Sequence, residues 1–144
     1  MKNIKRFFVV LTLTGLLSTL IGCGSNVEFG GKVTYSDDGS PLTTGTVVFK
    51  KGNLISKGNL KPDGTFVVGS MKENDGLVPG SYQVYITGAE KVAVPAKAEG
   101  FDPVMEPLID PKFTQPETSG LSIEVTKSTK KFEFQVDRYV PSKR

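Results

Sequence analysis

Short runs in which apolar and polar residues alternate dominate the chain between residues 27 and 136. Such alternation is typical of β-strands that bury one face, because successive side chains of a strand point to opposite sides. In the clearest run, residues 81–87, we expect Tyr82, Val84 and Ile86 to share a buried face. The other runs predict strands at 27–35, 46–49, 54–60, 65–68, 121–125 and 131–136.

Turn-forming residues separate these runs. Residues 61–64 read Lys-Pro-Asp-Gly and residues 77–80 read Leu-Val-Pro-Gly, in which proline presets one backbone angle and glycine accepts a positive φ. Residues 126–130 should form the turn of a hairpin between the last two strands. Because no window beyond the N-terminal segment has helical periodicity, we expect an all-β fold. The spacing favours an antiparallel Greek-key β-sandwich of about seven strands, with an up-and-down barrel as the alternative.

The alternation disappears in an excursion over residues 89–120, where prolines recur that neither continue a helix nor donate to a strand ladder. An excursion of this length is either functional or loosely ordered, and a brief helix or edge strand is expected around 91–94. Phe101 and Phe113 lie there outside any regular sheet face. They either anchor the loop on the sandwich or present an aromatic surface to a sugar or another partner.

The N-terminal segment has a different pattern. Three basic residues precede an apolar run over 7–20, which has the length of a secretory signal core and is short for a membrane span. The run ends in Leu20, Ile21, Gly22 and Cys23, a sequence that resembles the bacterial lipobox. The resemblance implies that the mature protein begins at Cys23, whose sulfur carries a lipid with acyl chains such as palmitate. The alternatives are an uncleaved anchor and an ordinary secretory signal in which the cysteine occurs by chance.

These features divide the chain into four segments: a lipoprotein signal peptide (1–22), a lipidated N-terminus with a short tether (23–29), a β-sandwich domain (30–138) and a flexible tail (139–144). We therefore expect export and a lipid anchor in the cell-envelope membrane. Gly24 follows the cysteine where a signal for inner-membrane retention often has aspartate. This difference favours the outer membrane or the periplasmic or outer surface.

Removal of the signal changes the charge balance. Lys2, Lys5 and Arg6 leave with it, so the 18 basic residues fall to 15 and equal the acidic ones. A nucleic-acid partner requires a clustered positive field, so none is expected. Cys23 is the only cysteine, so the domain should have no disulfide and should depend on its apolar core.

Several segments of the mature chain follow a common order of strands and turns. Gly-Lys-Val-Thr-Tyr at 31–35, Asp-Gly-Ser-Pro-Leu at 38–42 and Gly-Thr-Val-Val-Phe at 45–49 precede Asp-Gly-Thr-Phe at 63–66 and Leu-Val-Pro-Gly-Ser-Tyr-Gln-Val at 77–84. This order resembles the carboxypeptidase regulatory-like, or transthyretin-like, domain of small bacterial lipoproteins. Thr-Ser-Gly-Leu at 118–121 and the final Phe-x-Phe strand extend the resemblance to Asp137. It implies a seven-stranded prealbumin-like sandwich and an envelope location rather than an activity.

The sequence contains few residues that could support catalysis. The chain contains no histidine, which removes the usual general base, the usual zinc ligand and any Ser-His-Asp triad. Its aspartates occur as ordinary turn residues, and it has no Asp-x-Asp-x-Asp-Gly loop of the kind that binds calcium. We therefore expect no enzymatic activity, no cofactor and no metal site.

Two functions fit these observations. The preferred one is a membrane-anchored envelope lipoprotein whose sandwich is a structural module or binds another envelope protein or cell-wall glycan, through the excursion or an exposed sheet edge. The alternative is a carbohydrate-binding module at the cell surface, which would need a row of exposed aromatic side chains. The absence of tryptophan counts against this alternative.

Overall fold

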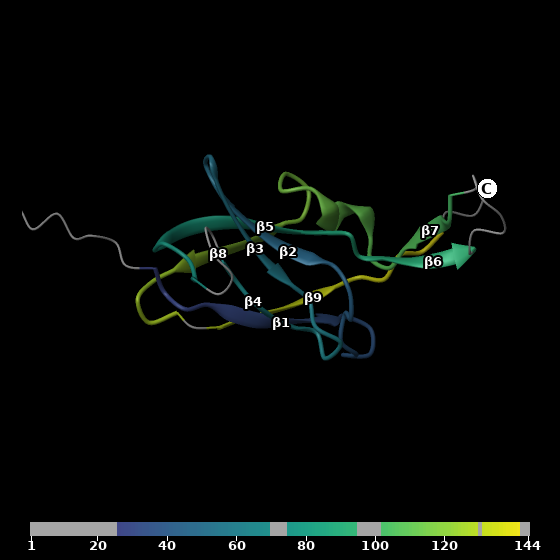
Figure 1. The fold of residues 1–144 in the computed structure, drawn as a ribbon, viewed down its shortest axis with the longest axis horizontal. Helices are drawn as coiled ribbons and strands as arrows, with labels where there is room; N and C mark the ends of the chain where they lie inside the picture. Colours follow the sequence, from purple (N-terminus) through teal and green to yellow (C-terminus); the bar gives the residue numbers. More distant parts are fainter. Residues whose placement is uncertain (1–25, 70–74, 95–101, 130, 142–144) are drawn as a thin grey trace, which may run out of the picture.

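The computed structural model describes residues 26–69, 75–94, 102–129 and 131–141. Within these ranges the chain forms β-strands and one short 3₁₀ helix (Figure 1). In chain order the elements are β1 (Gly30–Tyr35), β2 (Thr46–Lys51), β3 (Leu54–Asn59), β4 (Thr65–Val67), β5 (Gly80–Thr87), β6 (Glu90–Val94), β7 (Val104–Pro107), η1 (Pro111–Thr114), β8 (Leu121–Val125) and β9 (Lys131–Val136).

Two sheets pack against each other to form the body of the molecule (Figure 1). The three-stranded sheet has the order β4-β1-β9, and the four-stranded sheet has the order β3-β2-β5-β8. β1 and β9 run parallel, whereas the other paired strands run antiparallel. A bridge between Lys57 and Gly69 joins the two sheets along the side of β3 and β4. The predicted all-β sandwich of about seven strands is confirmed.

The predicted hairpin between the last two strands is wrong. β8 pairs with β5, with Val125 opposite Gly80, whereas β9 pairs with β1, with Val136 opposite Tyr35. The chain between β8 and β9 therefore crosses from one sheet to the other. Val125 and Val136 both face the core between the sheets. Alternation fixes which face of a strand is buried, but it does not fix which neighbour the strand pairs with.

Aromatic side chains form the centre of the core. The ring of Phe49 lies 5.6 Å from that of Phe29 and 6.4 Å from that of Tyr82, measured between centroids, and both contacts are edge-on. Such contacts add to the free energy gained by burying the rings. Tyr82, Val84 and Ile86 of β5 are all buried, which confirms their predicted shared face.

β6 and β7 form a separate ribbon, which we call the arm, and it projects beyond the sandwich (Figure 1). β6 is the short strand that was expected, with a helix as the alternative, around 91–94. At the base of the arm, the backbone N–H of Leu108 donates to Ala89 and that of Tyr139 donates to Leu108. The N–H of Asp110 donates to the carbonyl of Asp137. These bonds attach the C-terminal segment to the base of the arm.

The rest of the excursion returns to the sandwich. Asp110 caps η1 by accepting a hydrogen bond of 2.9 Å from the N–H of Lys112, and Pro111 occupies the first turn, where its missing N–H costs nothing. Ile109 is 1% exposed and Phe113 is 5% exposed, and both belong to the core. The described part of the excursion thus consists of a projecting arm and a packed return.

Candidate functional site

The residues predicted to carry the lipid precede the described part of the chain. Leu20, Ile21, Gly22 and Cys23 lie outside the described residues, and so does Phe101, which falls in the gap at 95–101. The described chain begins at Asn26, so Gly24 and Ser25 separate it from Cys23. The start of the described chain, drawn in purple, lies at the end of the molecule opposite to the arm (Figure 1).

Phe113 is the predicted partner-surface residue that the structure describes. Its side chain packs into the core from η1, and the ammonium group of Lys112 lies 4.7 Å from the ring centroid. Of the two roles that the sequence left open, the structure shows anchoring of the excursion. The ring is therefore not available as an aromatic surface for a partner.

The arm carries exposed apolar side chains on both faces. Val92 and Met105 lie opposite each other in the register and are 55% and 45% exposed, and Val104 is 57% exposed. Because successive residues of a strand point to opposite faces, Val104 extends this apolar character to the other side of the ribbon. Val92, Met105 and Val104 are called the arm surface below. Exposed apolar patches often mark sites of interaction, so the arm surface is the first candidate site.

The base of the arm is closed by a cluster of charged side chains. The guanidinium of Arg138 lies 3.7 Å from the ring centroid of Tyr35 and donates hydrogen bonds of 2.8 Å to Asp37 and Asp38. Ser40 donates to Asp38 from its hydroxyl at 2.6 Å and from its backbone N–H at 2.9 Å. The hydroxyl bond, followed by the backbone bond, lowers the pKa of Asp38 from 3.8 to about 2. Arg138 thus pairs with both carboxylates, and the cluster holds the C-terminal segment in place.

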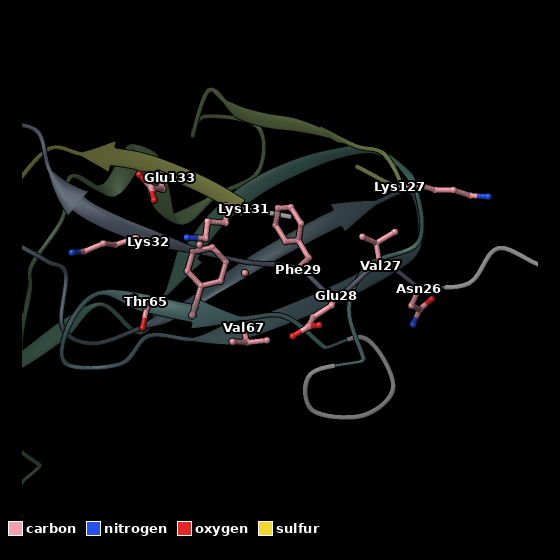
Figure 2. Close-up of a pocket in the computed structure, with 13 residues that line it drawn as sticks. Asn26, Val27, Glu28, Phe29, Lys32, Thr65, Val67, Lys127, Lys131 and Glu133 are labelled. Atoms are coloured by element: carbon pink, nitrogen blue, oxygen red, sulfur yellow. The ribbon is translucent and has the colours of Figure 1, made fainter. Parts of the chain in front are cut away.

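A groove of about 840 Å³ lies on the outer side of β1 and the residues that precede it (Figure 2). We call it the tether groove, and it is lined by residues 26–32, 65–67, 127, 131 and 133. Gly30 and Gly31 form part of its lining. A Cβ at Gly31 would lie 1.9 Å from the carbonyl oxygen of Phe132, and one at Gly30 would lie 2.6 Å from that of Phe66. The close approach of the neighbouring strands therefore requires glycine at both positions.

The tether groove is lined by charges of both signs. Lys32, Lys127 and Lys131 supply positive charge, and Glu28 and Glu133 supply negative charge (Figure 2). Within the described ranges, none of these five side chains forms an ion pair. The groove is the second candidate site, and sequence analysis missed it because pairing between β1 and β9 brings residues 30 and 131 together.

The described residues offer no constellation typical of an enzyme. The buried polar side chains are those of Ser56 and Ser119, and no buried carboxylate is among them. No group of three or more acidic, cysteine or histidine side chains in the described ranges is arranged to hold a metal ion. A carboxylate that acts as a general acid usually has its pKa raised by burial, and no carboxylate in these ranges is buried.

Most aromatic side chains of the described residues are buried. Among the described residues, Tyr85, Phe132 and Tyr139 are half-buried and the other aromatic side chains are buried. The row of exposed rings that a carbohydrate-binding module would use is therefore not seen in this part of the chain.

No protein-family model, curated protein or solved structure matches this chain. Within the described ranges, no helix has both the length and the apolar character needed to cross a membrane. Function is therefore inferred from the arm surface, the tether groove and the sequence of the N-terminal segment.

Proposed function

We propose that this protein is an exported, lipid-anchored lipoprotein of the cell envelope whose β-sandwich is a non-enzymatic binding module. The observation that carries the proposal is the position of the arm surface, at the end opposite to the start of the described chain (Figure 1). A chain attached to a membrane through Cys23 would hold Val92, Val104 and Met105 away from the bilayer. Another molecule of the envelope would find these side chains accessible there.

The sequence of the N-terminal segment supports the anchor. Leu20 to Cys23 resemble a lipobox, and Cys23 to Asn26 span three Cα steps, which reach at most about 11 Å. The domain would therefore stay close to the membrane surface. One acyl chain binds a bilayer only marginally, so the several chains of a bacterial lipoprotein make the attachment durable. Gly24 after the cysteine favours the outer membrane or the periplasmic or outer surface.

The arm favours a protein partner over a glycan. Among the described residues β6 pairs only with β7, so the backbone N–H and C=O groups along its other edge are open to a further strand. An extended segment of another envelope protein that pairs with this edge would bury Val92 and Met105 beside it. The exposed aromatic rings on which sugars often stack are not found among the described residues.

The anchor is tested by comparing the natural protein with Cys23→Ser in the native host. We expect the natural protein to fractionate with membranes and to show the mass of an acylated Cys23 peptide. Cys23→Ser should remain at precursor length and lack the acyl mass. Membrane fractionation of Cys23→Ser at mature length would contradict the lipoprotein assignment.

The binding role is tested by photo-crosslinking in cells. A photoreactive residue at position 92 should give a discrete adduct with another protein, whereas one at Ser122, which is exposed on β8, should not. Met105→Lys in the same chain should abolish the adduct, because a charge opposite position 92 disrupts an apolar contact. The proposal fails if position 92 gives no adduct, or if Met105→Lys leaves the adduct unchanged.

A further inference from the structure

The tether groove lies where the membrane would be. Its lining begins at Asn26, and Lys127 reaches the same end of the groove from the connection between β8 and β9 (Figure 2). With Cys23 lipidated, at most about 11 Å of extended chain separates Asn26 from the bilayer surface. The groove is thus the described surface that the anchor would bring closest to the lipid headgroups.

Lysine and arginine side chains at the two ends of the molecule differ in whether they form ion pairs. Near the arm, Lys91 pairs with Glu106, and Arg138 pairs with Asp37 and Asp38. Lys127 and Lys131 are exposed beside the tether groove and form no ion pair with another described residue. Positive charge at the tether end is therefore available to an anionic surface, whereas near the arm it is neutralised within the protein.

We propose that the tether groove docks on the phosphate groups of anionic phospholipids in the bilayer that anchors Cys23. Lys127 and Lys131 make the principal contacts, and Lys32 adds a third positive charge further along the groove. This inference rests on the proposed function for the position of the bilayer. Gly30, which shares the outward face of β1 with Lys32, places no side chain in the groove, so a headgroup can approach the backbone of β1 closely.

The carboxylates of the groove set the strength of this contact. Glu28 and Glu133 lie among the three lysines and repel phosphate, so the contact is weak in comparison with the acyl anchor. A weak contact beside a covalent anchor acts at a high effective concentration and is sufficient to orient the domain. Docking would hold the tether end of the domain at the bilayer, and the arm lies at the opposite end of the molecule (Figure 1).

The test uses the mature chain from residue 23 with Cys23→Ser, so that binding does not depend on acylation. Every member of the core cluster lies between Phe29 and Val136, so this chain contains the whole core. Its binding is measured by co-sedimentation with vesicles of equal parts phosphatidylglycerol and phosphatidylcholine, and with pure phosphatidylcholine vesicles. We expect stronger binding to the anionic vesicles, and we expect added salt to weaken it.

Charge variants test whether binding depends on the lysines of the groove or only on the overall positive charge of the protein. Lys127→Gln with Lys131→Gln should lower binding to the anionic vesicles by about tenfold or more. The matched control, Lys57→Gln with Lys61→Gln, removes two exposed lysines outside the groove and should change binding by less than about twofold. Glu28→Gln with Glu133→Gln should change binding in the opposite direction and strengthen it. A strengthened variant cannot be explained by loss of folding.

Equal binding to both kinds of vesicle would overturn the inference, and so would anionic binding that the Lys127 and Lys131 variant retains. The lipid anchor is tested separately by the acyl mass at Cys23. An unmodified Cys23 with salt-sensitive vesicle binding would refute the anchor and leave the groove contact standing. An acylated Cys23 without such binding would refute the groove contact alone.

Discussion

Tyr82 combines two interactions at one position. Its ring is 2% exposed in the core, and its hydroxyl donates to the carbonyl of Val78 at 2.7 Å, across the turn before β5. We expect Tyr82→Phe to lower the free energy of unfolding by about 1 kcal/mol through the lost hydrogen bond. Tyr82→Ala should lower it by about 3–5 kcal/mol because the core loses a ring. Urea unfolding measures both values, and a Tyr82→Ala protein as stable as its parent would contradict this packing.

Asp38 allows a second test at the scale of single atoms. The hydroxyl of Ser40 is the largest cause of its lowered pKa, ahead of the charge of Arg138. We expect Ser40→Ala to raise the pKa of Asp38 from about 2 towards 3.8, and Arg138→Gln to raise it by a smaller amount. Carbon-detected NMR of the carboxyl group as pH is varied gives the values directly.

Asp63 supplies the control for this titration. It accepts hydrogen bonds from the hydroxyl and backbone N–H of Thr65, and these likewise lower its pKa. Its pKa should be unchanged in both variants. Because folding lowers the pKa of Asp38, the stability it contributes is fully present above pH 3.8 and is lost as pH falls towards about 2. A larger rise in Arg138→Gln than in Ser40→Ala would mean that charge outweighs hydrogen bonding.

Single residues were predictable from the sequence where a strand pattern constrained them. The burial of Val84 follows from alternation alone, because Tyr82 and Ile86, two residues away on either side, are apolar and the run is long. The burial of Phe113 does not follow from any local pattern. It depends on the 3₁₀ turn that Asp110 and Pro111 form and on where that turn meets the sandwich. Loop residues are positioned by tertiary contacts, and no local alternation of apolar and polar residues indicates these contacts.

The excursion contains two elements with opposite energetic roles. Ile109 is 1% exposed in the core, whereas Val92 is 55% exposed on the arm. We expect Ile109→Ala to lower the free energy of unfolding by about 2–5 kcal/mol. Val92→Ala should change it by less than about 0.5 kcal/mol, because its side chain has little burial to lose. Urea unfolding of the two variants compares them directly, and similar losses would show that the arm is part of the folded core.

Strands were more predictable than their partners. The apolar runs located β2, β5 and β8 within a few residues, because alternation reports burial of one face. The parallel pairing of β1 with β9 joins Gly30 to Lys131, which are far apart in the sequence, and no turn signal connects them. For the same reason the tether groove, which is built across that pairing, could not be anticipated from either segment alone.

At the scale of the whole molecule, the two candidate sites imply a fixed orientation. The tether groove lies beside the start of the described chain and the arm lies at the opposite end (Figure 1). An acylated protein on anionic vesicles should therefore have Lys127 and Lys131 at the bilayer and Lys91, on β6, in solution. Both ends would be equally accessible if the domain tumbled freely about its tether.

Amine labelling with mass spectrometry distinguishes these two arrangements. On phosphatidylglycerol vesicles, we expect the labelling rates of Lys127 and Lys131 to fall several-fold relative to the unanchored protein, while the rate of Lys91 stays unchanged. A flexible Gly/Ser insertion of about ten residues between Ser25 and Asn26 adds a reach of about 17 Å and lowers the effective concentration of the groove at the membrane. The protection should shrink with this insertion. An equal fold-change at Lys91 and Lys127, each relative to the unanchored protein, would show that the domain has no preferred orientation, because free movement about the tether would shield both ends alike.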